Sequence, residues 1–130
     1  MRSALGFIAA VIAVSTMLAA PALAQGWPAY GGDAGGTRYS AARQITRENV
    51  HELALAWTYH SGEVARRGDL MKRSATEVTP ILAEGKLVFC TPFDRVVALD
   101  PATGRELWVF DPGLPAKFEP GNGFICRGVA

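Results

Sequence analysis

The sequence predicts an all-β fold of short antiparallel strands that follows an N-terminal export signal. Apolar residues alternate with other residues in several short runs, and the runs recur about every 8–12 residues, as in β-sandwiches and β-propellers. The chain contains 14 glycines and 8 prolines, which favour turns over long helices. The sequence stops at Ala130 in mid-pattern. If these strands form a propeller blade, we expect the sequence to be incomplete, because repeat units do not bury their faces alone.

Residues 1–24 are expected to form a cleaved signal peptide. One positive charge precedes an almost wholly apolar stretch over residues 4–20, and an A-x-A site at residues 22–24 predicts cleavage before Gln25. A permanent transmembrane anchor is the alternative, because the stretch approaches the ~20 residues that span a bilayer. Its many alanines and Pro21 favour cleavage. We therefore predict export to the periplasm, compatible with association with the inner membrane.

Composition excludes some partners and leaves the cysteines open. The formal net charge is +1, which gives no reason to expect binding to nucleic acid or to an anionic membrane surface. Cys90 and Cys126 would enter an oxidising compartment, where they could bridge or stay as two buried thiols. Nothing in the sequence resembles a dense disulfide framework, and this favours the thiols.

The first part of the mature chain is predicted to be an arm. Residues 26–40 are rich in glycine and carry three aromatic residues, which we expect to pin the arm onto a larger body; these are Trp27, Tyr30 and Tyr39. Thr46 is a plausible N-cap, with Glu48 in the first turn, so a helix of at most two turns should follow.

The remainder is predicted to be mainly β-structure. The expected strands are 53–59, 77–82, 86–91, 95–100 and 106–110. A charged stretch over 63–73 has no clear apolar face and is expected to be a solvated loop whose basic residues, Arg66, Arg67, Lys72 and Arg73, form a solubilising surface. Gly85 should supply the positive φ of a hairpin loop over 83–85, and residues 101–104 should form a turn with Gly104 left-handed.

Residues 98–108 carry the most specific motif, Ala-Leu-Asp-Pro-Ala-Thr-Gly-Arg-Glu-Leu-Trp. This segment resembles the tryptophan-docking motif of the pyrroloquinoline quinone-dependent (quinoprotein) dehydrogenases. Asp100 can accept hydrogen bonds from turn amides, Gly104 supplies backbone freedom, and Trp108 offers a flat face to a neighbouring blade. Trp57 and Trp108 are both expected in the core. Scaffold propellers share this repeat, so the motif alone does not indicate catalysis.

Other segments extend the resemblance over nearly the whole mature chain. They are 27–33 with 38–40, 44–57, Glu77-Val78-Thr79-Pro80 and Cys126-Arg127-Gly128-Val129. Alcohol dehydrogenases of the family have two adjacent cysteines where this chain has Ile125 and Cys126. A single cysteine there looks more like the glucose, quinate and shikimate or polyol branch, whose members often carry several membrane helices that are not found in this sequence.

The resemblance implies one eight-bladed β-propeller of quinoprotein dehydrogenase type, with residues 25–130 as its N-terminal arm and first blade or blades. It assigns cofactor contacts to Glu77 and Arg127. Taken without the resemblance, Glu77 is a solvated edge carboxylate and Arg127 a surface cation. A glutamate that faces a polyanionic quinone must be protonated or share positive partners. Arginine would donate charge-assisted hydrogen bonds to the quinone oxygens.

The implied activity is oxidation of a sugar, polyol or cyclic alcohol by pyrroloquinoline quinone, with calcium as a second cofactor and the membrane quinone pool or a cytochrome as electron acceptor. The catalytic base and the calcium ligands are expected beyond residue 130, and His51 and His60 are not expected to bind a metal. We therefore expect the segment alone to be inactive. A non-enzymatic scaffold propeller of the outer-membrane assembly type and a self-contained small binding domain are the alternatives.

Overall fold

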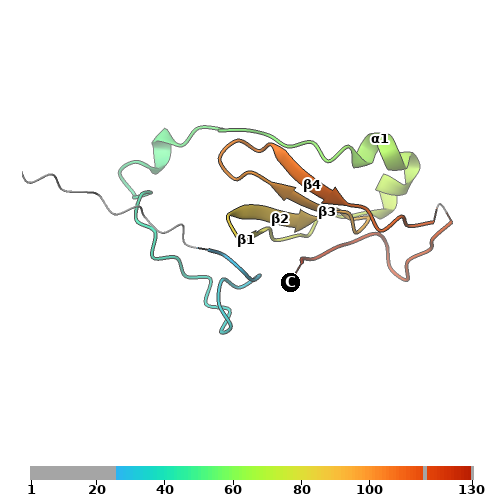
Figure 1. Cartoon of the computed structure of the whole chain (residues 1–130), viewed down its shortest axis with the longest axis horizontal. Coiled ribbons are helices and arrows are strands. Elements are labelled where there is room, and N and C mark those ends of the chain that lie inside the picture. Colours follow the sequence, from blue (N-terminus) through green and yellow to red (C-terminus); the bar gives the residue numbers. More distant parts are fainter. Residues whose placement is uncertain (1–25, 116, 130) are drawn as a thin grey trace, which may run out of the picture.

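The computed structural model describes residues 26–115 and 117–129, so the predicted signal peptide lies outside the described residues. Its centre is a four-stranded antiparallel sheet in which each strand pairs with the next along the chain (Figure 1). The strands are β1 (Ile81–Ala83), β2 (Lys86–Cys90), β3 (Val96–Leu99) and β4 (Glu106–Phe110). The predicted hairpin and the two strands after it are confirmed, and a four-stranded meander is the form of one propeller blade.

The two tight turns of the sheet follow from their residues. Glu84 and Gly85 have φ values of 48° and 72°, which two-residue hairpins require because such turns match the twist of the strands. In the turn between β3 and β4, Asp100 Oδ1 accepts hydrogen bonds from the amides of Ala102 and Thr103, both at 2.9 Å. Gly104 has a φ of 69°. The predicted roles of Asp100 and both glycines are confirmed.

β1 begins later than predicted. Residues 77–80 belong to no strand, and Pro80 has no N–H with which to extend the ladder towards β2. The predicted strand over 53–59 is wrong as well. This stretch is extended, but it pairs with no strand, and its side chains attach it to the sheet instead. Trp57 Nε1 donates to the carbonyl of Pro101 at 3.1 Å, and the Tyr59 hydroxyl donates to Glu106 Oε2 at 2.6 Å.

The charged stretch over 63–73 is helical, contrary to the predicted loop. It forms α1 (Glu63–Arg67) and the 3₁₀ helix η2 (Gly68–Arg73). Glu63 is buried and pairs with Arg95, the residue just before β3. This buried ion pair attaches the helix to the sheet. The absence of an apolar face in the sequence of this stretch therefore did not indicate a loop.

The N-terminal arm is attached to the sheet by Trp27. The backbone of Trp27 exchanges two hydrogen bonds with Leu82 of β1, at 3.0 and 2.7 Å. Tyr30 and Tyr39 are 56% and 69% exposed, so of the three aromatic residues only Trp27 follows the prediction. The helix predicted after Thr46 is reduced to the single 3₁₀ turn η1 (Val50–Glu52). No helix among the described residues is long and apolar enough to cross a membrane.

A small core lies against the sheet. Its most completely buried side chains are Phe93, Leu99, Val97 and Cys90. The ring of Phe124 packs on that of Phe93 with centroids 4.5 Å apart, which brings the C-terminal segment onto this core. Cys90 is bonded to Cys126, so the expectation of two free thiols is wrong. The pairing depends on the return of the chain after β4, which the spacing of the two cysteines does not reveal.

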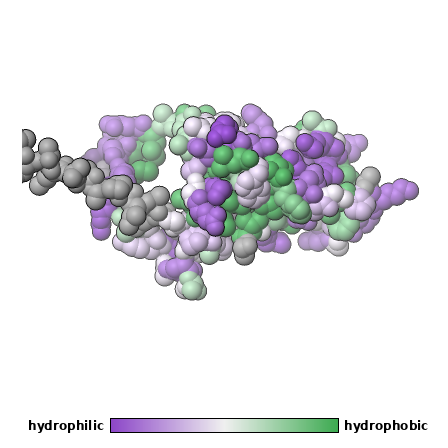
Figure 2. All heavy atoms as spheres, viewed as in Figure 1, coloured by the Kyte–Doolittle hydropathy of each residue, from purple (hydrophilic) through white to green (hydrophobic). Residues whose placement is uncertain are grey.

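Trp108 is 43% exposed, and the expectation that it lies in the core is wrong for the described residues. Register places Trp108 opposite Ala98, which in turn lies opposite Val88, so these side chains share one face of the sheet. Trp108 and Val88 line an open apolar groove together with Ile81 and Val96. Figure 2 shows hydrophobic atoms gathered over the sheet. A single sheet needs a second layer of structure to bury an apolar face. Trp57 is half-buried.

Candidate cofactor site

Two segments that are distant in sequence run side by side and bring the predicted cofactor residues together. Ser74 and Phe124 form a parallel bridge. The Phe124 amide donates to the carbonyl of Arg73 at 2.9 Å, and the Ala75 amide donates to the carbonyl of Phe124 at 3.1 Å. Farther along, the Thr79 amide donates to the carbonyl of Arg127 at 3.5 Å. The segment before β1 and the segment after β4 are thus aligned in the same direction.

Glu77 and Arg127 form an ion pair at this junction. Arg127 Nε lies 3.2 Å from Glu77 Oε2, and the two side chains are 72% and 45% exposed. Each residue is therefore accessible, as a solvated carboxylate or a surface cation would be, but each has an oppositely charged partner. Both residues were predicted from the sequence, but their ion pair was not, because nothing in their local sequences indicates that the two segments are neighbours.

The pair has the composition that a polyanionic quinone requires. A lone carboxylate would repel such a cofactor. Arg127 balances the charge of Glu77 through Nε, and its guanidinium has four further N–H donors in a planar fork suited to oxygen acceptors. Because the arginine side chain is 72% exposed, a ligand could reach those donors. The residues present thus fit pyrroloquinoline quinone.

A disulfide lies directly beside this pair. Cys126 precedes Arg127 in the chain, and its partner Cys90 is the last residue of β2. The two Cα atoms are 6.0 Å apart. Cys90 is 1% exposed, so the bond joins the segment that carries Arg127 to the core of the sheet.

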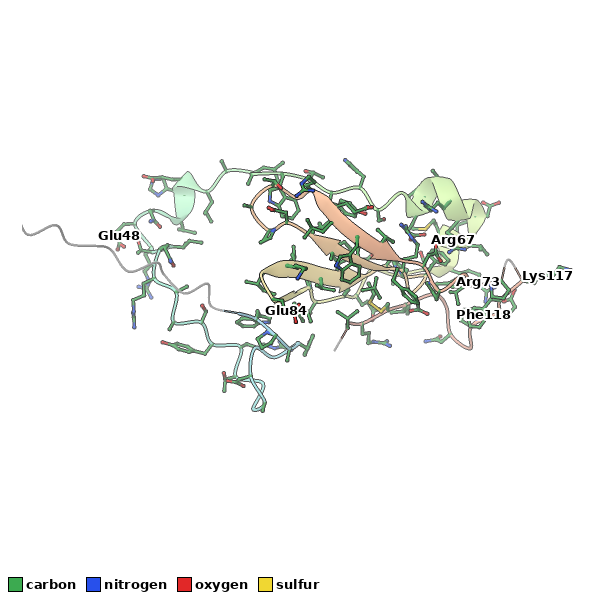
Figure 3. The ribbon with its side chains drawn as sticks, viewed as in Figure 1. Glu48, Arg67, Arg73, Glu84, Lys117 and Phe118 are labelled. Atoms are coloured by element: carbon green, nitrogen blue, oxygen red, sulfur yellow. A yellow bond between two sulfur atoms is a disulfide. The ribbon has the colours of Figure 1, made fainter. Side chains whose placement is uncertain are left out.

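A second charged cluster lies at the end of the sheet next to α1. It was not predicted from the sequence. Arg95 Nη1 donates to Glu63 Oε1 at 2.9 Å and to the carbonyl of Ser61 at 3.0 Å. Arg95 Nε lies 3.5 Å from Asp111 Oδ2. The guanidinium of Arg67, labelled in Figure 3, lies 3.5 Å from Glu63 through Nε. The i,i+4 spacing of Glu63 and Arg67 was the one local signal of this cluster.

This cluster holds elements together and does not resemble a ligand site. Glu63 and Arg95 are 3% and 4% exposed, and a buried charge must be paired. Arg67 is not part of a solubilising surface, since it also lies over the ring of Phe93, 4.8 Å from its centroid. Among residues 26–115 and 117–129, no group of three or more histidine, cysteine and acidic side chains could hold a metal ion.

Tyr59 is the described residue whose titration is most perturbed. Burial, followed by the hydrogen bond to Glu106 and the charge of that carboxylate, raises the pKa of Tyr59 to about 12. All three causes favour the neutral phenol. Its hydroxyl therefore acts as a hydrogen-bond donor that fastens the extended segment 53–60 to β4, and it is not a base.

Comparison with known proteins gives one consistent result. The family model described as glucose/ethanol/alcohol dehydrogenase, beta-propeller domain, matches residues 27–130. Quinoprotein glucose dehydrogenase A of Acinetobacter calcoaceticus is 39% identical over 88% of this chain and 14% of its own length. Glycerol dehydrogenase large subunit of Gluconobacter thailandicus is 39% identical over 79% of this chain and 14% of its own length.

Among solved structures, the quinohemoprotein alcohol dehydrogenase from Comamonas testosteroni superposes with a TM-score of 0.56 at 33% identity, over 69% of this chain and 12% of that chain. The chain thus spans about a seventh of the length of the curated relatives it matches. These relatives are dehydrogenases, so a non-enzymatic scaffold propeller is not favoured. The chain belongs to the pyrroloquinoline quinone-dependent dehydrogenase family and forms part of its β-propeller domain.

Proposed function

We propose that this chain supplies the first blade and part of the cofactor site of a periplasmic dehydrogenase that oxidises a sugar, polyol or cyclic alcohol. The observation that supports this proposal best is the ion pair between Glu77 and Arg127, 3.2 Å apart on two segments held in parallel. When bound, pyrroloquinoline quinone supplies the acceptor for the hydride of the alcohol.

In this proposal Arg127 is the electrostatic group of the site. Its remaining N–H donors would bind the quinone oxygens and would stabilise negative charge on them. Glu77 accepts from Arg127 Nε and so orients the guanidinium. The same carboxylate limits the net positive charge that Arg127 brings to the site.

The rest of the catalytic machinery is assigned to parts of the enzyme outside the described residues. We place the catalytic base and the calcium ligands beyond residue 130. The electrons pass to the membrane quinone pool or to a cytochrome. A relative described as 1-butanol dehydrogenase (cytochrome c), from Thauera butanivorans, supports the second acceptor.

Substitutions in the full-length enzyme test the site. We expect Arg127→Ala to lower turnover by roughly 10²-fold, the effect of removing a donor that stabilises developing charge. Glu77→Ala should weaken cofactor binding clearly, and Glu77→Gln should weaken it less, because the amide oxygen still accepts from Arg127 Nε. Turnover and the dissociation constant of the quinone are the measurements.

The matched control is a second arginine–glutamate pair on the same segment. Arg73 Nη1 lies 2.7 Å from Glu119 Oε2, and the side chains are 51% and 71% exposed. Arg73→Ala should leave turnover and quinone affinity within twofold of wild type. Unaltered turnover in Arg127→Ala, or equal losses in both arginine variants, would contradict the proposed site.

A further inference from the structure

The side chain and carbonyl of Arg127 have weak attachments to the rest of the described residues. Its side chain is 72% exposed and paired with a carboxylate that is itself 45% exposed, and such pairs fix geometry poorly because water and salt compete with them. Its carbonyl accepts one hydrogen bond, from the Thr79 amide at 3.5 Å, which is long for a hydrogen bond. The ion pair orients the guanidinium, but neither contact fixes the backbone that carries Arg127.

The residues just before Arg127 are attached firmly. Phe124 is 4% exposed, packs on Phe93, and exchanges backbone hydrogen bonds with residues 73 and 75. Cys126 is covalently bonded to Cys90, which is 1% exposed within the core. The disulfide is therefore the last strong attachment of the chain before Arg127, and it acts at the adjacent residue.

We infer that the Cys90–Cys126 disulfide is a positioning device for Arg127, so that binding of the quinone depends on the redox state of these cysteines. The inference rests on the proposed cofactor role of Arg127. Alcohol dehydrogenases of the family have two adjacent cysteines at this position. In this chain the partner of Cys126 is instead Cys90, at the end of β2. The bond fixes the backbone that carries the arginine.

The redox step is ordinary thiol–disulfide exchange. A dithiol such as dithiothreitol donates two electrons and two protons to the disulfide and is oxidised to its cyclic disulfide, and Cys90 and Cys126 each become a thiol. The segment after Phe124 then remains attached through its noncovalent contacts alone. We expect the quinone dissociation constant of the reduced protein to rise about tenfold.

The test measures quinone affinity of the full-length apoenzyme by fluorescence titration, in four proteins that form a double-mutant cycle: wild type, Cys90→Ser/Cys126→Ser, Arg127→Ala, and the combination of all three substitutions. The double cysteine variant should bind about tenfold more weakly than wild type. In the Arg127→Ala background the same cysteine substitutions should have almost no effect, because the residue that the disulfide positions is absent.

The outcomes separate this inference from the proposed function. If Arg127→Ala binds the quinone as wild type does, the proposed function fails. If Arg127→Ala binds weakly and the cysteine variant binds normally, only the positioning role is overturned. If the cysteine substitutions weaken binding equally in both backgrounds, the disulfide supports the fold in general and the inference is again overturned.

A second measurement covers the case in which the cysteine variant fails to fold. Folded wild-type apoenzyme is reduced with dithiothreitol, its thiols are alkylated, and quinone affinity is measured again. A rise of about tenfold in the dissociation constant supports the inference, and an unchanged constant in protein with both cysteines alkylated overturns it. Where the cysteine variant folds, its insensitivity to the same treatment is the control for other cysteines of the full-length chain.

Discussion

Gly104 shows how one residue can connect the turn of a blade with a distant segment. Its φ is 69°, and an added Cβ would lie 2.5 Å from Cδ2 of Trp57. The indole of Trp57 therefore packs directly on the backbone of this turn, while its Nε1 donates to the carbonyl of Pro101. Glycine is needed here for two separate reasons, backbone conformation and space.

Substitution of two turn glycines separates those reasons. Gly85 has a φ of 72° and no atom within 4 Å of an added Cβ, so Gly85→Ala should cost about 1 kcal/mol from backbone strain alone. Gly104→Ala should cost roughly 1–3 kcal/mol more, because the methyl group overlaps the indole ring. The difference is measured from the urea unfolding midpoints of the full-length variants, and equal midpoints would contradict the packing described.

The stability of the folded protein at alkaline pH depends on the ionisation of the Tyr59 side chain. Burial and Glu106 raise its pKa to about 12, whereas the ordinary value is 10.0. Above pH 10 the unfolded chain loses this proton while the folded protein keeps it, so the stabilising contribution is complete below pH 10 and is lost as the pH rises towards 12.

We expect Tyr59→Phe to be less stable than wild type near neutral pH, since the hydrogen bond to Glu106 is lost. The difference in unfolding midpoint between wild type and Tyr59→Phe should become smaller as the pH rises above 10. Unfolding midpoints of both proteins across that range give the result. A gap that stays constant with pH would show that Tyr59 does not titrate as described.

At the scale of elements, α1 depends on one buried carboxylate. Glu63 is 3% exposed and pairs with Arg95, and removing one member of a buried pair leaves the other charge without compensation. Glu63→Ala should therefore destabilise the protein by about 3 kcal/mol. The neighbouring pair of Asp69 and Lys72 is 91% and 80% exposed, so Asp69→Ala should have little effect. Similar unfolding midpoints for the two variants would argue against this role of Glu63.

The elements that were predicted correctly have local causes. The hairpin of β1 and β2 follows from Gly85, and the turn before β4 follows from Asp100 and Gly104, each of which acts on backbone within a few residues. The errors have distant causes. The helix at 63–67 depends on Arg95, thirty-two residues after Glu63, and the alternation over 53–59 reflects attachment to the sheet through side chains.

The same difference between local and distant causes explains which features of the candidate cofactor site were predicted. Glu77 and Arg127 were identified through the family resemblance of their own segments, and their cofactor contacts remain predictions. Their ion pair and the disulfide beside it both arise because the chain returns after β4 to lie along residues 73–79. No local pattern of residues specifies that return, so the sequence could supply the members of the site and not its arrangement.

At the scale of the whole molecule, the open face around Trp108 indicates where this blade would pack against a neighbouring one. The side chain is 43% exposed beside an apolar groove, although an aromatic residue of this size stabilises a fold mainly through burial. In a propeller domain the adjacent blade would cover this face. The sheet therefore gains its full stability only within the larger ring.

Export of the whole protein is predicted from residues 1–24. Expressed with its own N-terminus, the full-length protein should appear in the periplasmic fraction with Gln25 as its first residue. N-terminal sequencing of that fraction is the measurement. Recovery of a membrane-bound protein that begins at Met1 would instead support the alternative of a permanent anchor.

The backbone pairing of Trp27 with Leu82 protects the protein against misassembly. β1 is the first strand of the sheet, and its outer side would otherwise present unpaired N–H and C=O groups to any passing strand. The arm occupies that position at one residue, and the Trp27 indole packs on Gly32 so closely that an added Cβ there would lie 3.1 Å from the ring. A protein cut after the arm should thus be more prone to polymerise through its sheet, even though every strand remains intact.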